Sequence, residues 1–139
     1  MRIGLVSCAK TKQKGVHPAK ELYCSALFRQ AFSFAVATCD RVYILSAKHG
    51  LLMPETRIRD YNVTLNSASR HERQRWGKRV LQQLENRVAP GDELFFFCGK
   101  KYREYLTPAL HGKCHLLMPL RGLSLGQQLH WYKMKTPPA

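Results

Sequence analysis

Acidic residues are scarce in this chain of 139 residues. Nine Asp and Glu stand against 23 Lys and Arg, which gives a formal net charge of +14. The scarcity argues against a carboxylate-bound metal and against a glycosidase-type pair of acids. The positive excess favours polyanionic partners, nucleic acid before nucleotides and both before anionic membranes, although a merely solubilising surface would carry the same charge.

Long apolar runs are missing as well, because Arg29, Arg41 and Arg121 interrupt the longest ones. None approaches the ~20 residues of a membrane-spanning helix, so we expect no membrane partner. The opening MRIGLV turns polar too early for a secretory signal. The five cysteines are odd in number and show no CxxC pair, which is typical of free thiols in a reducing compartment. We therefore expect a cytoplasmic protein.

Generic functional motifs are also absent. The chain has no GxGxxG, no P-loop, no nucleophile elbow and no zinc pattern, and we predict neither a metal nor a cofactor. The phrase GLSLG, at 122–126, has the glycines of an anion site at the start of a helix but is too short to be specific.

What the chain does contain is an alternation of strand and helix patterns. Runs of β-branched, aromatic and aliphatic residues predict buried strands at 2–6, 41–45, 93–98 and 115–118. Ser25 can cap a first helix, and Ser69 with Glu72 makes a capping box ahead of a second one. Shorter helices are predicted at 101–106, ending before Pro108, and at 125–133. The second helix carries one buried stripe, formed by Trp76, Val80, Leu84 and Val88.

This alternation predicts the fold class. Neighbouring parallel strands need right-handed crossovers, which place helices against the sheet. We predict a single, Rossmann-like α/β domain over 1–135, with three layers: a small, mainly parallel four-stranded sheet and helices on both of its faces. Residues 136–139 are predicted to form a disordered tail.

Polar and cationic phrases follow each predicted strand. In open parallel sheets ligands bind at the carboxyl ends of the strands, so we expect the four phrases to converge on one site. They are LVSCAKTK at 5–12, YILSAKHGLL at 43–52, CGKKY at 98–102 and PLRGLSLGQQL at 119–129.

The side chains of these phrases and their neighbours suggest three kinds of role. Hydroxyls, amines, an imidazole and one carboxylate make candidate catalytic groups: Ser7, Lys10, Ser46, His49, Asp60 and Tyr61. Donors and glycines suited to a phosphate make candidate ligand-binding groups: Lys48, Gly50, Gly99, Lys100, Tyr102, Gly122, Gly126 and Gln127. The second helix offers a basic nucleic-acid surface or only a solvated face, in either case formed by Arg70, Arg73, Arg75, Lys78 and Arg79.

Other residues of these phrases have a plainer interpretation. We interpret Cys8 as a small buried residue at a strand end rather than a nucleophile, although surrounding lysines would favour its thiolate. The remaining lysines are interpreted as solvated charges: Lys12, Lys14, Lys20 and Lys101.

Several phrases together resemble known families. VSCAKTK, ELYCSALF, YILSAKHGLLMPETRIRDYNVTL and PLRGLSLGQQLHW resemble a family of small uncharacterised domains of bacteria and phages. More distantly, SxAKT at 7–11 and LSxxxGxLxP at 45–54 resemble the signature of the YaaA-like peroxide-stress proteins. The distant resemblance implies DNA binding and a stress-response role. It matches this chain at Ser7, Lys10, Ser46, Gly50 and Tyr61, whereas Cys8 stands where those relatives have proline.

The first functional hypothesis is a nucleic-acid-directed protein that cleaves or exchanges an N-glycosidic bond, or otherwise acts on a base in DNA or RNA, with DNA favoured over RNA. Only Asp60, His49 or a neutral lysine could activate water for such a reaction. The alternative is an enzyme or sensor that binds a nucleotide or small phosphorylated ligand at the same strand ends. A purely structural adaptor would leave the clustered polar residues unexplained.

Overall fold

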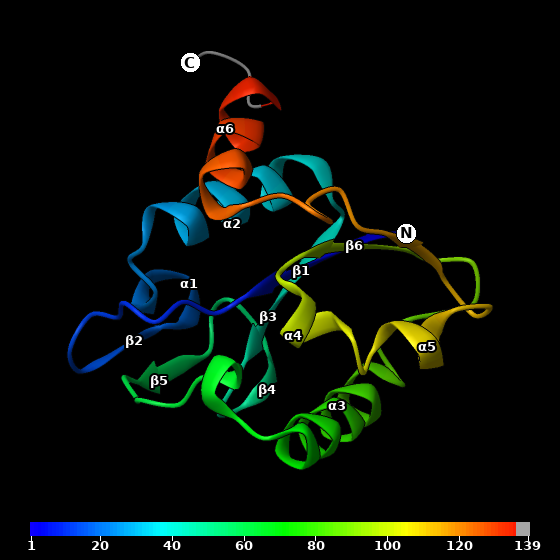
Figure 1. The fold of residues 1–139 in the computed structure, drawn as a ribbon, viewed down its shortest axis with the longest axis horizontal. Helices are drawn as coiled ribbons and strands as arrows, with labels where there is room; N and C mark the ends of the chain where they lie inside the picture. The colour runs from blue at the N-terminus through cyan, green and yellow to red at the C-terminus, as the bar shows by residue number, and fades with distance from the viewer. Residues whose placement is uncertain (136–139) are drawn as a thin grey trace.

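A computed structural model describes residues 1–135 and has a mixed α/β fold built on one five-stranded sheet (Figure 1). The strand order is β4-β3-β1-β6-β7, with β4 antiparallel to β3 and all other neighbours parallel. The strands of this sheet are β1 (Arg2–Ser7), β3 (Arg41–Ser46), β4 (Gly50–Leu52), β6 (Glu93–Phe97) and β7 (His115–Leu117).

The prediction of four strands is wrong by one. The four predicted runs correspond to β1, β3, β6 and β7, and the additional strand is β4, at the edge beside β3. The chain reverses directly after Ser46, and Gly50 has a φ of +73° that other residues rarely adopt. This glycine therefore serves a tight turn, and the turn creates the fifth strand.

The remaining elements are helices and one small ribbon. A second sheet pairs β2 (Val16–Pro18) with β5 (Arg57–Arg59) in antiparallel fashion. A 3₁₀ turn, η1, covers Leu65–Ser67. The helices are α1 (Ala19–Leu22), α2 (Ala26–Thr38), α3 (Arg70–Leu84), α4 (Lys100–Arg103), α5 (Thr107–Leu110) and α6 (Leu125–Lys135).

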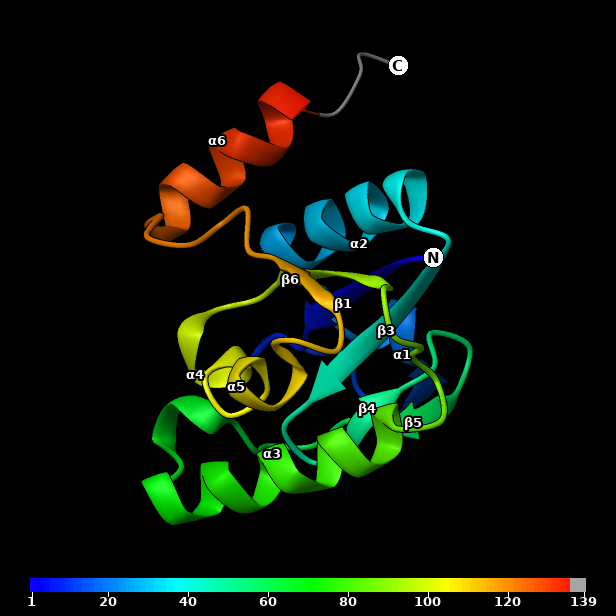
Figure 2. The same ribbon diagram turned by 90° about the vertical axis from the view of Figure 1, so that its right-hand side faces the viewer.

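Two apolar clusters cover the two faces of the sheet. Ile3 and Leu5 of β1 pack in the cluster that contains Trp76 and Val80 of α3. Val6 packs in the other cluster, with residues of α2 and α6. Alternate side chains of a strand point to opposite faces, which produces this division. Figure 2 shows α2 and α6 on one side of the sheet and α3, α4 and α5 on the other.

Local signals account for the starts of the two longest helices. The Ser25 hydroxyl accepts the backbone N–H of Phe28 at 3.1 Å, and Ser69 forms the predicted capping box with Glu72. The helix predicted at 101–106 is shorter than predicted, because α4 ends at Arg103, and a separate helix, α5, starts at Thr107. Pro108 lies in the first turn of α5, where the missing N–H of proline costs no hydrogen bond. The predicted tail, 136–139, lies outside the described residues.

The packing of α3 makes a stability prediction. A Cβ on Gly77 would lie 2.8 Å from the Cβ of Tyr105, whereas a Cβ on Gly126 of α6 would meet no atom within 4 Å. We expect Gly77→Ala to lower the free energy of unfolding by about 1–3 kcal/mol through overpacking. Gly126→Ala is the matched control, and we expect it to be neutral or to stabilise by up to about 1 kcal/mol. Urea denaturation measures both, and equal effects would contradict this close helix packing.

Candidate functional site: a lysine-lined cavity at the strand ends

A cavity of about 630 Å³ lies at the carboxyl ends of β1 and β6. The chain passes from β1 to its neighbour β3 on one side and from β6 to its neighbour β7 on the other side. The connections that follow β1 and β6 therefore diverge between these two adjacent strands. Diverging connections leave a crevice, which is the usual ligand site of open parallel sheets. We call this space the strand-end cavity; its walls come from the segments 7–12, 25–31, 62–66, 97–102 and 120–132.

Five of the predicted site residues line the strand-end cavity: Ser7, Lys10, Gly99, Lys100 and Tyr102. Lys12 and Lys101, both interpreted from the sequence as solvated charges, line it too, so four lysines line one space. The described residues that line the cavity include no Asp, Glu or His. The cavity is therefore strongly cationic, and it offers an anion many donors without a competing carboxylate.

Lys12 was interpreted as a solvated charge, and the structure places it in the cavity wall instead. Its Nζ lies 4.5 Å from the centre of the Tyr61 ring and donates to the Lys10 carbonyl at 3.2 Å. Partial burial lowers the pKa of Lys12, although Cys8 and Asp60 act in the opposite direction. An isolated bridge between Lys12 and Tyr23 folds the segment back over the site. No short-range pattern in the sequence signals this long-range pairing.

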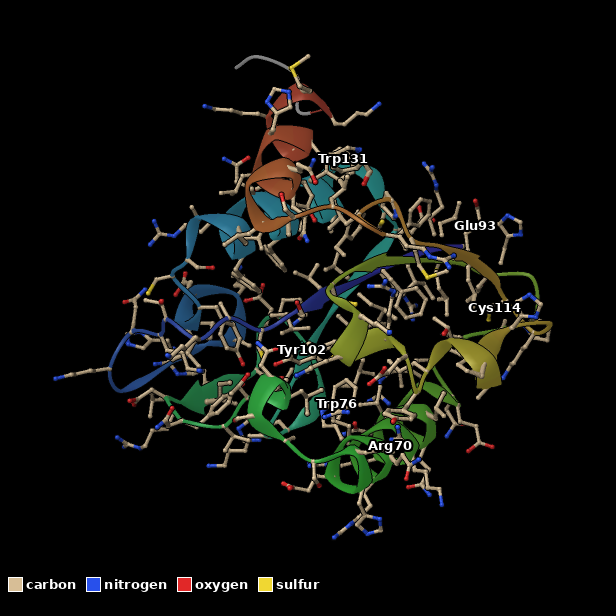
Figure 3. All side chains as sticks on the ribbon, viewed as in Figure 1. Arg70, Trp76, Glu93, Tyr102, Cys114 and Trp131 are labelled. Carbon is tan, nitrogen blue, oxygen red and sulfur yellow. The ribbon has the colours of Figure 1, made fainter. Side chains whose placement is uncertain are left out.

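Cys8 forms part of the cavity floor. Its Sγ lies 3.4 Å from the hydroxyl of Tyr102, and that hydroxyl also accepts the N–H of Leu65 at 3.5 Å. The Tyr102 ring meets Trp76 edge-on at 5.6 Å, so its position is fixed from below by α3 (Figure 3). Burial, with a smaller contribution from Cys8, raises the pKa of Tyr102. The tyrosine is therefore a neutral hydrogen-bonding group at physiological pH.

Ser46 and Tyr61 lie together behind the cavity wall. The Tyr61 hydroxyl is 2.8 Å from Ser46 Oγ and 2.6 Å from the hydroxyl of Tyr23, and Ser46 Oγ also accepts the N–H of His49 at 3.0 Å. Ser46 is completely buried. Burial raises the pKa of Tyr61 and raises that of Tyr23 to about 12. This chain of hydroxyl groups links the segments that carry Tyr23, Ser46 and Tyr61. The Ser46 hydroxyl is thus engaged in hydrogen bonds within the protein.

The other candidate catalytic groups, His49 and Asp60, do not line the strand-end cavity. The His49 ring meets Tyr61 edge-on at 5.6 Å, and burial, Lys48 and Arg79 lower the His49 pKa. Asp60 accepts the N–H of Gly15 at 2.9 Å and so joins two loops. The Nζ of Lys48 is 6.0 Å from the centre of the Tyr61 ring, and Lys48 does not line the cavity.

The remaining ligand-binding candidates are dispersed. Gly50 faces Gln83 of α3, and Gly122 lines an adjoining hollow. Gly126 and Gln127 belong to α6 and do not line the cavity, whereas Gln128 does. Gln127 forms a capping box with Ser124, which satisfies two of the backbone donors at the start of this helix.

The basic residues of α3 divide into two groups. Arg73 Nε lies 3.2 Å from Glu104 Oε1, and Arg79 donates to the Lys48 carbonyl at 2.8 Å. These two guanidinium groups are held by the protein itself. The exposed remainder of the predicted surface is Arg70, Arg75 and Lys78.

Two further features of the described residues bear on ligands and location. Within 1–135, no group of three or more His, Cys, Asp or Glu side chains is arranged to hold a metal ion. A search of the same residues finds no helix with the length and apolarity needed to cross a bilayer.

Fold and site together define a basic α/β domain with a lysine-lined cavity at the ends of its parallel strands. The chain belongs to a family of unknown function, DUF6884, whose model matches residues 3–134. It is also similar to the uncharacterized protein YfjM of Bacillus subtilis strain 168, with 29% identity over 127 residues that cover 86% of this chain and 83% of YfjM. No solved structure matches. The two matches thus confirm the predicted resemblance to a family of small uncharacterised domains.

Proposed function

We propose that this protein binds nucleic acid and takes one nucleotide of the strand into the strand-end cavity. One observation carries the proposal: four lysines line the cavity, and no acidic residue lines it with them. Lysine contacts with phosphate release counterions and supply most of the affinity of sequence-independent nucleic-acid binding. A formal charge of +14 over the whole chain supports the same class of partner.

The other walls of the cavity suit a base. Apolar surface comes from Leu27, Phe28 and Phe97, and amide groups come from Asn62 and Gln128. A base can pack on the apolar part, while the amides can donate to and accept from its edge. The resemblance to the YaaA-like proteins favours DNA over RNA. The exposed Arg70, Arg75 and Lys78 of α3 could hold phosphates farther along the strand.

We propose the N-glycosidic bond of the bound nucleotide as the bond that reacts. In hydrolysis this bond breaks with its electron pair passing to the base, a water oxygen joins C1′, and the proton released by that water goes to the base. Lys12 can donate a proton to the departing base and recover one from the water, and its lowered pKa favours the donation. Asp60 and His49 lie outside the cavity lining, so the geometry supports binding more directly than it supports catalysis.

A free nucleotide is the second candidate ligand. The cavity volume of about 630 Å³ lies within the ~300–1,000 Å³ range of small-molecule sites. A nucleotide enzyme or sensor would use the same lysines without a polymer.

Titration of a labelled single-stranded oligonucleotide across salt concentrations tests the proposal. Binding at low salt should weaken with a slope of about −3 or steeper in log K against log[salt], because the four cavity lysines predict about 0.7 per phosphate contact on a single strand and contacts from α3 would add to this. A labelled duplex and unlabelled mononucleotides are titrated in parallel, and released base is assayed by chromatography. Displacement by mononucleotides at a similar affinity would favour the free-nucleotide alternative, and no binding at low salt would contradict a nucleic-acid function.

A further inference from the structure

A second hollow adjoins the strand-end cavity and shares a wall with it. This hollow has a volume of about 660 Å³ and is lined by the β6–α4 connection and by the segment between β7 and α6. Gly99, Lys100 and Gln128 line both spaces. Lys100 therefore stands at the boundary between two concave sites rather than at the edge of one.

The second hollow is cationic by its own residues. Arg103 and Arg121 line it and do not line the strand-end cavity. One Arg103 nitrogen donates to the Cys98 carbonyl at 3.2 Å, which fixes this guanidinium while leaving other N–H donors for a ligand. Glu104 is the acid among the lining residues, and its carboxylate is paired with Arg73 at 3.2 Å.

The backbone is open at two glycines of these hollows. A Cβ built on Gly99 would meet no atom within 4 Å, and the same holds for Gly122, which lines the second hollow alone. The main chain can therefore approach a ligand closely at both positions. Such an opening between two basic hollows fits a chain of linked phosphates better than a single compact anion.

We propose that the second hollow holds the nucleotide adjacent to the one in the strand-end cavity, with its phosphodiester between Lys100 and Arg121. This inference rests on the proposed function and makes it more specific: the ligand is a single strand of at least two nucleotides, and a mononucleotide fills only half of the site. Arg121 is exposed, and its side chain is free to reach a phosphate that enters from solvent.

The test compares 5′-phosphorylated dinucleotides of mixed sequence with the matching mononucleotides, by calorimetry, on three proteins. For the wild type we expect the dinucleotides to bind at least about tenfold more tightly, since a charge-assisted contact to a second phosphate is gained. Arg121→Ala should remove that tenfold advantage and leave mononucleotide binding unchanged. Arg29→Ala removes the same charge from an exposed position of α2 that lines neither hollow, and it should change neither affinity.

The outcomes separate this inference from the proposed function. Equal affinities of the wild type for both probes, or an Arg121→Ala variant that keeps the dinucleotide advantage, would overturn the second subsite and leave the strand-end cavity in place. Failure of both probes to bind the wild type would overturn the proposed function and the subsite with it. A Gly99→Val variant checks the boundary that the two hollows share: it should fold, because a Cβ at this position meets no atom within 4 Å and the φ of −76° suits valine, and it should weaken binding of both probes, because Gly99 lines both hollows.

Discussion

Lys10→Ala is expected to weaken oligonucleotide binding about 10- to 100-fold while leaving the free energy of unfolding nearly unchanged. Lys10 is exposed and lines the strand-end cavity, so its side chain contributes little packing but faces the proposed phosphate. A charge-assisted hydrogen bond is worth about 1.5–3 kcal/mol, which corresponds to this loss of affinity. The bond from Lys12 Nζ is made to the Lys10 carbonyl, and alanine retains that carbonyl.

Lys133→Ala is the matched control for this variant. Lys133 is an exposed lysine of α6 that does not line the cavity, and its loss changes the net charge by the same amount. Fluorescence anisotropy gives the two dissociation constants, and thermal denaturation gives the stabilities. Equal, modest losses of affinity would reduce Lys10 to one part of a diffuse basic surface. An unfolded Lys10→Ala protein would give this lysine a structural role instead.

The local patterns of the sequence are sufficient to predict most of the sheet and helices. The four predicted runs correspond to the parallel strands because buried strands need continuous apolar runs. Ser25 and the Ser69–Glu72 pair mark helix starts because their caps involve only residues three apart. The Ser124–Gln127 capping box has the same spacing, so this local signal was present in the PLRGLSLGQQL phrase.

The position of β4 could not be predicted from strand propensity. This strand covers only Gly50–Leu52 and exists because the turn after Ser46 returns the chain along β3. Three apolar or small residues give no periodicity that separates a strand from a loop. The edge strand is therefore a consequence of the turn and of its pairing partner.

The sequence predicts where the site lies, but it does not predict every residue that lines it. Ser7 ends β1, Lys10 follows it and Lys100 follows β6, and the ends of parallel strands meet at one edge. The roles of Ser46 and Tyr61 depend on a hydroxyl chain that joins residues far apart in sequence. Cys8 and Lys12 belong to the LVSCAKTK phrase, but their contacts with Tyr102 and Tyr23 join separate segments of the chain. Such contacts leave no pattern in the sequence around either residue.

The five cysteines provide an internal set of reporters for the position of a ligand. Cys8 and Cys24 are both half-buried, but only Cys8 lines the strand-end cavity. Cys98 also borders the cavity, but it is buried, and burial raises its pKa to about 12, so its thiol reacts slowly. A ligand in the cavity should therefore shield the thiol of Cys8 and leave the thiol of Cys24 unaffected.

The most direct measurement is the rate at which a small thiol reagent, methyl methanethiosulfonate, labels each cysteine with and without a single-stranded oligonucleotide, followed by mass spectrometry. At an oligonucleotide concentration 100 times the dissociation constant, we expect Cys8 labelling to slow by about 100-fold, because only the ligand-free fraction reacts. Cys24 labelling should be unchanged. An unaltered rate at Cys8 under saturating oligonucleotide would contradict a nucleotide in the strand-end cavity.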